Sequence, residues 1–150
     1  MKILIVDDNQ GLAHILKMML DEEKHEVRLA RDGKDGYLNY LLCKPDLIIT
    51  DIQMPEKNGL KLMEIIMEII RKDNPEIKMI YVSTALSRFL PLLEEEKRRY
   101  PVSYLQKPFS KSELMRLLSL FSSERREVRK VKEIIPNSQI GESMNGGKRR

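Results

Sequence analysis

Short apolar runs alternate along the chain with longer segments in which apolar residues recur at helical spacing. The runs predict five strands, at residues 2–6, 26–30, 47–51, 77–83 and 102–106. The longer segments predict five helices, at residues 10–24, 34–43 and 60–72, in the charged segment that ends near residue 99, and from residue 110 onward. Strict alternation with right-handed crossovers predicts an α/β domain, in which a parallel sheet has helices on both faces.

The strand at residues 47–51 reads Leu-Ile-Ile-Thr-Asp and shows no polar alternation. A continuous apolar run of this kind indicates a strand that is buried on both faces of a parallel sheet. In the segment 34–43, we expect Tyr37, Leu38, Leu41 and Leu42 to point inward. Cys43 is the single cysteine, so an internal disulfide is excluded, and we expect a core or helix-end thiol.

The composition is that of an ordinary globular protein, with 41% apolar and 33% charged residues in 150. No apolar run approaches the ~18 residues that a membrane span needs. The first nine residues, MKILIVDDN, carry charge and have no cleavage site, so we interpret them as a strand rather than a signal peptide. We therefore expect one domain, located in the cytoplasm, with no membrane association.

The net charge of +4 lies entirely in residues 123–150, which carry eight basic and four acidic residues. Residues 1–122 are neutral, so the basic pI does not indicate a nucleic-acid-binding face of the domain. About 28 residues cannot build an independent core, and we expect no DNA-binding output domain and no direct DNA binding. Residues 136–150 are expected to form a disordered basic tail.

Between the domain and this tail, residues 123–135 allow two interpretations. Apolar residues recur every seven positions at Leu114, Phe121, Val128 and Ile135, which is typical of a coiled-coil arm that could form a homodimer. The alternative, which we favour, is a charged helix end that frays.

Polar residues follow four of the predicted strands. Asp7 and Asp8 follow the first strand, Asp51 closes the third, Ser83 and Thr84 end the fourth, and Lys107 follows the fifth. In open α/β sheets the ligand crevice lies beyond the carboxyl ends of the strands, so these groups are expected at one edge. Each group alone reads as a helix cap or a strand exit, whereas their joint occurrence predicts a site.

Three neighbouring carboxylates repel one another, by roughly 4 kcal/mol per close pair at an effective dielectric constant of 20. Such a cluster favours a hard cation, and Mg²⁺ suits one or two carboxylates while keeping several coordination positions for water.

These motifs resemble the receiver domain of bacterial two-component response regulators over about residues 1–122. The matching residues are Asp7-Asp8, the block from Asp51 to Pro55 with Gly59, Thr84-Ala85, Tyr104, and Lys107-Pro108-Phe109. The resemblance implies a flavodoxin-like, doubly wound sheet of five strands in the order 2-1-3-4-5, with five helices. The turn before the fifth strand and Pro91 depart from the family pattern.

The resemblance also implies roles for individual residues. Asp51 would be the phosphoacceptor, and Asp8, Asp51 and the backbone carbonyl of Gln53 would bind Mg²⁺, with Asp7 acting mostly through water. Thr84 and Lys107 would bind phosphoryl oxygens, and Tyr104 would be the aromatic switch. Ser83 precedes Thr84, so the choice of hydroxyl is ambiguous, and Ala85 favours Thr84.

The function we expect is that of a response regulator in a phosphorelay. A sensor histidine kinase or a phosphotransfer protein would phosphorylate Asp51, and a downstream protein not identified by the sequence would receive the signal by contact. One alternative is a haloacid-dehalogenase-type phosphatase, which also uses an Asp nucleophile and Mg²⁺ but requires Asp-x-Asp after its first strand. Another alternative is a receiver used only as a structural adaptor.

Overall fold

The computed structural model describes the backbone of residues 1–52 and 59–134, and the side-chain surroundings of residues 1–52 and 65–122. Residues 1–111 and 112–150 form two compact units. The first unit contains the whole sheet and the first four α-helices. The predicted element order is therefore confirmed over the described part of the chain.

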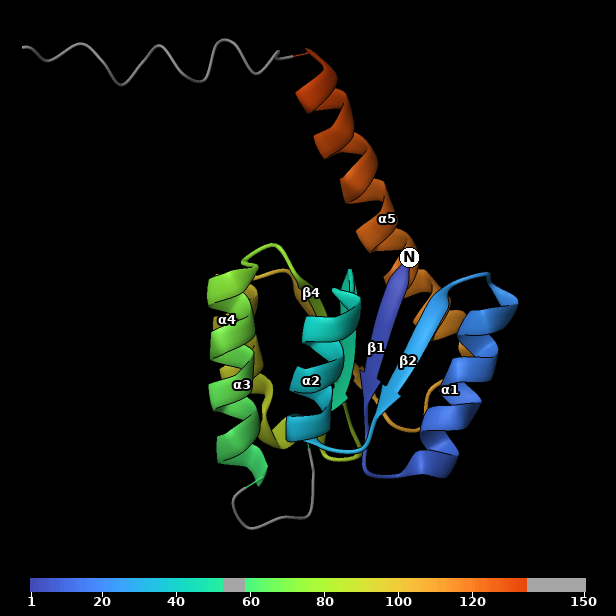
Figure 1. Ribbon diagram of the computed structural model, residues 1–150, viewed down its shortest axis with the longest axis vertical. Helices are drawn as coiled ribbons and strands as arrows, with labels where there is room; N and C mark the ends of the chain where they lie inside the picture. Colours follow the sequence, from blue (N-terminus) through green and yellow to red (C-terminus); the bar gives the residue numbers. More distant parts are fainter. Residues whose placement is uncertain (53–58, 135–150) are drawn as a thin grey trace, which may run out of the picture. The chain divides into compact units, whose positions relative to one another are not determined.

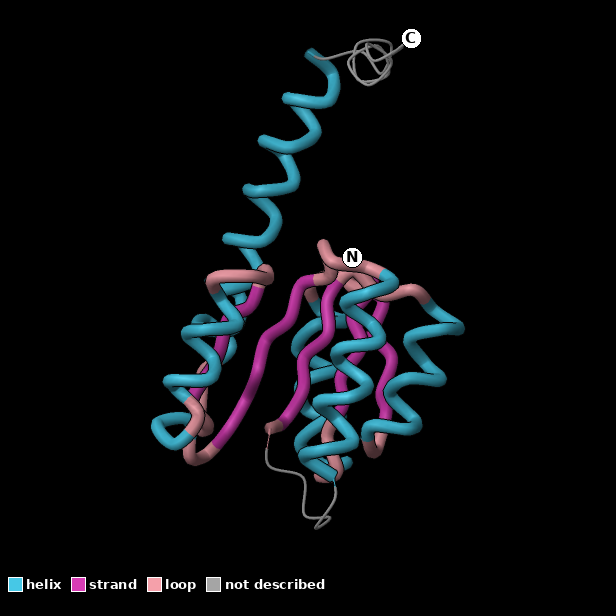
Figure 2. Tube along the Cα trace, turned by 90° about the vertical axis from the view of Figure 1, so that its left-hand side faces the viewer, coloured by secondary structure: helices cyan, strands magenta, loops and turns pink. Residues whose placement is uncertain are grey.

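Five parallel strands form one sheet in the order β2-β1-β3-β4-β5, as expected. The strands are β1 (Lys2–Val6), β2 (Glu26–Ala30), β3 (Leu47–Asp51), β4 (Lys78–Ser83) and β5 (Val102–Gln106). The helices are α1 (Gln10–Glu22), α2 (Gly33–Cys43), α3 (Gly59–Asp73), the 3-10 turn η1 (Leu86–Arg88), α4 (Leu90–Lys97) and α5 (Lys111–Ile134). The strands run side by side (Figure 2), and the arrowheads of β1 and β2 point to the same edge of the sheet (Figure 1).

The strand order places the helices of the first unit on both faces. From β1 the chain crosses to β2 on one side of the sheet, whereas each later connection steps toward the other side, where β5 lies. Because all of these connections are right-handed, α1 covers one face of the sheet and α2, α3 and α4 cover the other. Both faces of the central strands are buried, and the β3 residues Leu47, Ile48 and Ile49 are at most 1% exposed. This is the reason for the unbroken apolar run in that strand.

The helix boundaries follow local chemistry. The Asn9 side chain accepts a hydrogen bond from the Leu12 backbone and caps α1, and Asp32 caps α2 by accepting from Asp35. In the fourth helical segment, the turn η1 precedes α4, and Pro91 lies in the first turn of α4, where its missing N–H costs nothing.

The predicted inward face of α2 is wrong for its three leucines, whereas Tyr37 is partly buried and packs against the core. Leu38, Leu41 and Leu42 are 52%, 44% and 77% exposed. The buried face instead contains Gly33, Gly36, Tyr40 and Cys43, so the expectation of a buried, helix-end Cys43 is confirmed. The reason is close packing on β1: a Cβ at Gly36 would lie 3.0 Å from the Val6 side chain. Small residues, which carry no hydropathy signal, therefore mark the contact.

Helix α5 continues to Ile134, so residues 123–134 are helical. The coiled-coil and frayed-end interpretations of this segment both stay predictions, and the predicted tail at 136–150 lies outside the described residues. Among the helices that the structure describes, none is long and apolar enough to cross a lipid bilayer.

Candidate functional site

The carboxyl edge of the sheet brings together the acidic residues that follow β1 and end β3. Asp7, Asp8 and Asp51 each place a carboxylate oxygen within 4.8 Å of the others. Asp7 is 3% exposed, Asp51 is half-buried and Asp8 faces solvent. The parallel pairing of β1 with β3 produces this cluster, because it aligns Val6 with Thr50, the residues that precede Asp7 and Asp51.

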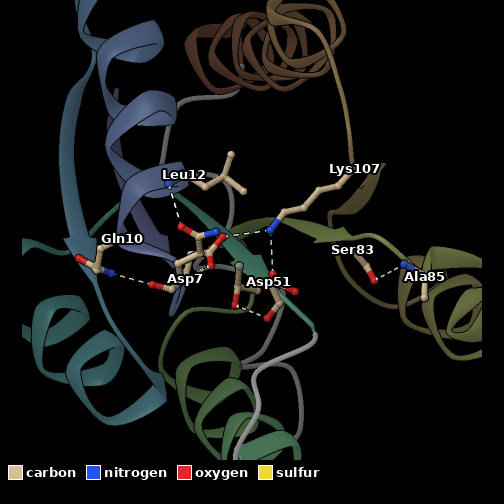
Figure 3. Close-up of polar contacts among 9 residues, drawn as sticks. Asp7, Gln10, Leu12, Asp51, Ser83, Ala85 and Lys107 are labelled. Atoms are coloured by element: carbon tan, nitrogen blue, oxygen red, sulfur yellow. Dashed lines mark hydrogen bonds and ion pairs between the residues drawn. The ribbon is translucent and has the colours of Figure 1, made fainter.

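The loop between β1 and α1 holds Asp7 in a fixed orientation. One carboxylate oxygen of Asp7 accepts a hydrogen bond from the Asn9 backbone at 2.9 Å, and the Gln10 side chain donates to the Asp7 carbonyl at 2.7 Å (Figure 3). The backbone of Asp7 also donates to the Ala30 carbonyl on β2. A buried carboxylate is thus positioned by its own turn.

Lys107 reaches the cluster from the end of β5. Its ammonium donates to Asp51 at 2.7 Å and to Asp7 at 3.1 Å, and its side chain is only 10% exposed (Figure 3). Burial works against the charged ammonium, but the hydrogen bonds to Asp51 and Asp7 outweigh it, and the pKa of Lys107 is raised. The Lys107–Pro108 peptide bond is cis.

The electrostatics of Asp8 fit a cation site. Its pKa is raised, first by partial burial and then by the neighbouring Asp7, with a smaller contribution from Asp51. The single ammonium of Lys107 therefore does not fully offset the repulsion among the three carboxylates, and a divalent cation would relieve the remainder. The donor set consists of oxygens only, and it suits Mg²⁺.

The two candidate hydroxyls have different surroundings. Ser83 is the last residue of β4 and is fully buried, and its hydroxyl accepts a hydrogen bond from the Ala85 backbone at 3.0 Å (Figure 3). Thr84 follows the strand and is exposed. The Gln106 side chain fixes this loop by donating to the Thr84 carbonyl at 2.7 Å and accepting from the Leu86 backbone at 3.2 Å.

Tyr104 lies on β5, half-buried, and contacts α4. Its hydroxyl donates to the Glu94 carboxylate, and the Lys97 ammonium lies 5.5 Å from its ring centroid. The hydrogen bond to Glu94 is the main reason that the pKa of Tyr104 is raised. Gln53, the remaining residue expected in the site, lies outside the described residues.

Sequence reasoning identified the three carboxylates and Lys107, but it missed the positioning residues. Gln10 and Gln106 act through their amides on neighbouring loops. Their signal in the sequence is weak, because glutamine beside a strand end is usually a solvated surface residue.

Comparison with known proteins agrees with this geometry. Residues 3–119 match the family model described as the response regulator receiver domain. The transcriptional regulatory protein PdtaR of Mycobacterium tuberculosis is 36% identical over 128 residues, which cover 85% of this chain and 59% of that protein. CpxR of Escherichia coli is 33% identical over 114 residues, covering 76% and 46%. The chain thus spans about half the length of these curated relatives.

Solved structures are similar over most of the chain. A response regulator receiver domain protein from Clostridium thermocellum superposes with a TM-score of 0.70 at 22% identity, covering 85% of this chain and 98% of that one. The response regulator TrrA from Thermotoga maritima, solved in complex with Mg²⁺ and BeF, gives a TM-score of 0.64 at 29% identity, covering 79% and 96%. The chain belongs to the response regulator receiver family, whose members are phosphoacceptor signalling domains of two-component systems rather than classical enzymes.

Proposed function

We propose that Asp51 accepts a phosphoryl group from a phosphohistidine of a sensor kinase or phosphotransfer protein, with Mg²⁺, and that the phosphorylated domain signals by protein contact. The observation that carries this proposal is the position of Lys107, whose ammonium contacts both Asp51 and Asp7 at the carboxyl edge of the sheet. Family membership argues against the phosphatase alternative.

In the proposed transfer, a carboxylate oxygen of Asp51 forms a bond to phosphorus, and the bond from phosphorus to the donor nitrogen breaks. The electron pair of that bond leaves with the imidazole. Asp51 needs no base, because a carboxylate is already ionised, and the barrier depends on positioning and on neutralising charge. Lys107 would donate a hydrogen bond to a phosphoryl oxygen, in place of the Asp51 oxygen that its ammonium contacts at 2.7 Å.

Asp7, Asp8 and Asp51, together with the backbone carbonyl of Gln53, would hold the metal. A bound Mg²⁺ supplies positive charge next to the phosphoryl oxygens. The presence of Mg²⁺ and BeF in the TrrA complex supports the same assignment here. Asp8 faces solvent and would bind the metal directly, whereas Asp7 is buried and fixed by its turn and would act mostly through water.

One hydroxyl at the end of β4 is proposed to bind a second phosphoryl oxygen. The sequence favours Thr84, whereas burial at the strand end favours Ser83. The variants Ser83→Ala and Thr84→Ala distinguish the two, because loss of the binding hydroxyl should shorten the lifetime of the phosphorylated protein and weaken beryllofluoride binding. The other variant should retain both properties.

Tyr104 is the proposed switch residue. It is held against α4 by Glu94, so a shift of the loop after β4 on phosphorylation would change this contact and the α4 surface. Glu94→Gln should weaken the contact and alter the fluorescence or NMR response of Tyr104 to beryllofluoride.

The central test is phosphorylation by a small donor. The full chain is incubated with acetyl phosphate and Mg²⁺, and its intact mass is measured. The wild-type chain should gain one phosphoryl group, and Asp51→Asn should gain none. Asp46→Asn is a matched control, because Asp46 directly precedes β3 at the opposite end of the same strand. Phosphorylation of the Asp51→Asn chain would contradict the assignment, and a wild-type chain that accepts no phosphoryl group would favour the structural adaptor.

A further inference from the structure

Gln106 lies between the two segments that carry the proposed phosphoryl-binding groups. It is the last residue of β5, directly before Lys107, and it pairs in register with Ser83, the last residue of β4. The backbone of Lys107 also donates a hydrogen bond to the Ser83 carbonyl at 2.8 Å. The ammonium and the two candidate hydroxyls therefore come from adjacent strand ends.

The Gln106 amide bridges these segments with both of its polar ends. Its nitrogen donates to the Thr84 carbonyl at 2.7 Å and to the Lys107 carbonyl at 3.0 Å. Its oxygen accepts from the Leu86 backbone at 3.2 Å. One side chain thus holds the loop after β4 at two backbone positions and the Lys107 peptide at a third. These positions require a group that both donates and accepts, as an amide does, whereas an ionised carboxylate only accepts.

These contacts matter for phosphoryl binding because they restrain the backbone. A hydroxyl on a restrained backbone reaches a phosphoryl oxygen by rotation of its own side chain, whereas a hydroxyl on an unrestrained loop also loses backbone freedom when it binds. Donors that are held in place beforehand stabilise an incoming charge more than donors that must first be ordered. The shared amide also keeps the spacing between the loop and Lys107, so both donors are presented to the same group.

We propose that Gln106 is a positioning residue for the phosphoryl group. It aligns the hydroxyl at the end of β4 with the Lys107 ammonium, and it thereby sets how tightly the site binds a phosphoryl group and how fast it accepts one. This inference rests on the proposed phosphorylation of Asp51. Gln106 acts through the backbone, so its role is the same whichever of the two hydroxyls binds the phosphoryl oxygen.

The test measures the affinity of the full chain for beryllofluoride in the presence of Mg²⁺, and the rate at which acetyl phosphate phosphorylates the chain. Gln106→Leu keeps a side chain of similar size but removes all three hydrogen bonds. Because Gln106 is exposed, water can reach the loop groups that it leaves, and the chain should still fold. We expect the affinity and the rate each to fall by about 2- to 12-fold, the factor that one ordinary hydrogen bond provides.

Gln106→Glu supplies a readout that a merely structural role would not change. At neutral pH the new carboxylate can accept from Leu86 but cannot donate to the two carbonyl oxygens. Protonation restores one donor, so the beryllofluoride affinity relative to the wild type should rise as the pH falls toward about 4.5, close to the ordinary glutamate pKa of about 4.3. The affinity of Gln106→Leu relative to the wild type should stay constant over the same range.

Asn39→Leu is the matched control, because the Asn39 amide donates within α2, to the carbonyl and the carboxylate of Asp35. This variant should bind beryllofluoride as the wild type does. Wild-type affinity in Gln106→Leu, or a pH profile of Gln106→Glu that runs parallel to that of the wild type, would overturn this inference and leave the proposed function intact. A wild-type chain that binds no beryllofluoride would overturn the proposed function and this inference together.

Discussion

The ion pair between Arg71 and Glu96 should contribute far more to stability than its neighbour on the same helix. Glu96→Ala leaves the buried guanidinium of Arg71 without its counterion. Removing one partner of a buried pair costs about 3 to 5 kcal/mol. The Glu96 side chain is 25% exposed, and Arg71 keeps its contacts with Tyr81 and Tyr100, so water and the two rings recover part of this cost.

We therefore expect Glu96→Ala to lower the free energy of unfolding by about 2 to 4 kcal/mol, roughly 1 kcal/mol less than the cost for a fully buried pair. With a urea m-value of about 1.5 kcal/mol per M, the unfolding midpoint should fall by roughly 1.3 to 2.7 M. The measurement is equilibrium urea denaturation followed by circular dichroism, at pH 7 and moderate salt.

Glu95→Ala is the matched control. Glu95 is the preceding residue of α4, and it forms an ion pair with Arg99 at 3.1 Å in which the two side chains are 69% and 61% exposed. The substitution removes the same group from the same helix, and an exposed pair contributes less than about 1 kcal/mol. Equal losses in the two variants would refute the argument that burial sets the contribution of the Arg71 pair.

The remaining predictions concern the carboxylate cluster and the contact between α2 and α3. Asp8→Ala should stabilise the metal-free chain by roughly 1 kcal/mol, because it removes one of three repelling anions at a solvated position. Calorimetry should show weakened Mg²⁺ binding by this variant, and an unchanged Mg²⁺ affinity would contradict the prediction. Lys107→Met should destabilise the metal-free chain by about 2 to 4 kcal/mol, and Mg²⁺ should raise the melting temperature of this variant more than that of the wild type; an equal rise would count against the shared cluster. The Tyr40 hydroxyl, with help from Lys44, lowers the pKa of Asp73 below its usual 3.8, so this stabilisation is complete above about pH 4 and is lost as the pH falls through the lowered pKa. Tyr40→Phe should therefore be less stable than the wild type at pH 6, with a difference that shrinks below pH 4 in urea denaturation; a constant difference would exclude the linkage.

The sequence determined the order and type of the elements, because apolar runs of five residues and segments of helical period are local signals. Asp51 stood out for the same reason, since an apolar run ends there at a carboxylate. The carboxyl-edge rule then placed Asp7, Asp8 and Lys107 beside it, and the structure brings these residues together. The strands are parallel, so their carboxyl ends all lie at the same edge of the sheet.

The tertiary structure decided which surfaces meet. Gly36 and Tyr40 face the sheet, whereas three leucines of α2 face solvent. The helix packs so closely on Val6 that a small residue is required at the contact. The apolar pattern of the sequence does not reveal this requirement, because it reflects hydropathy and not side-chain size. The sequence placed the end of β4 at residue 83 and favoured the Thr84 hydroxyl, and only the structure shows that Ser83 is buried at that strand end while Thr84 is exposed in the loop that follows. Arg71 lies in the last turn of α3, and the packing of α3 against α4 buries it in an ion pair with Glu96 beside a cavity. Contacts between distant segments depend on side-chain shape and on the exact packing of helices, and a local pattern in the sequence does not encode either.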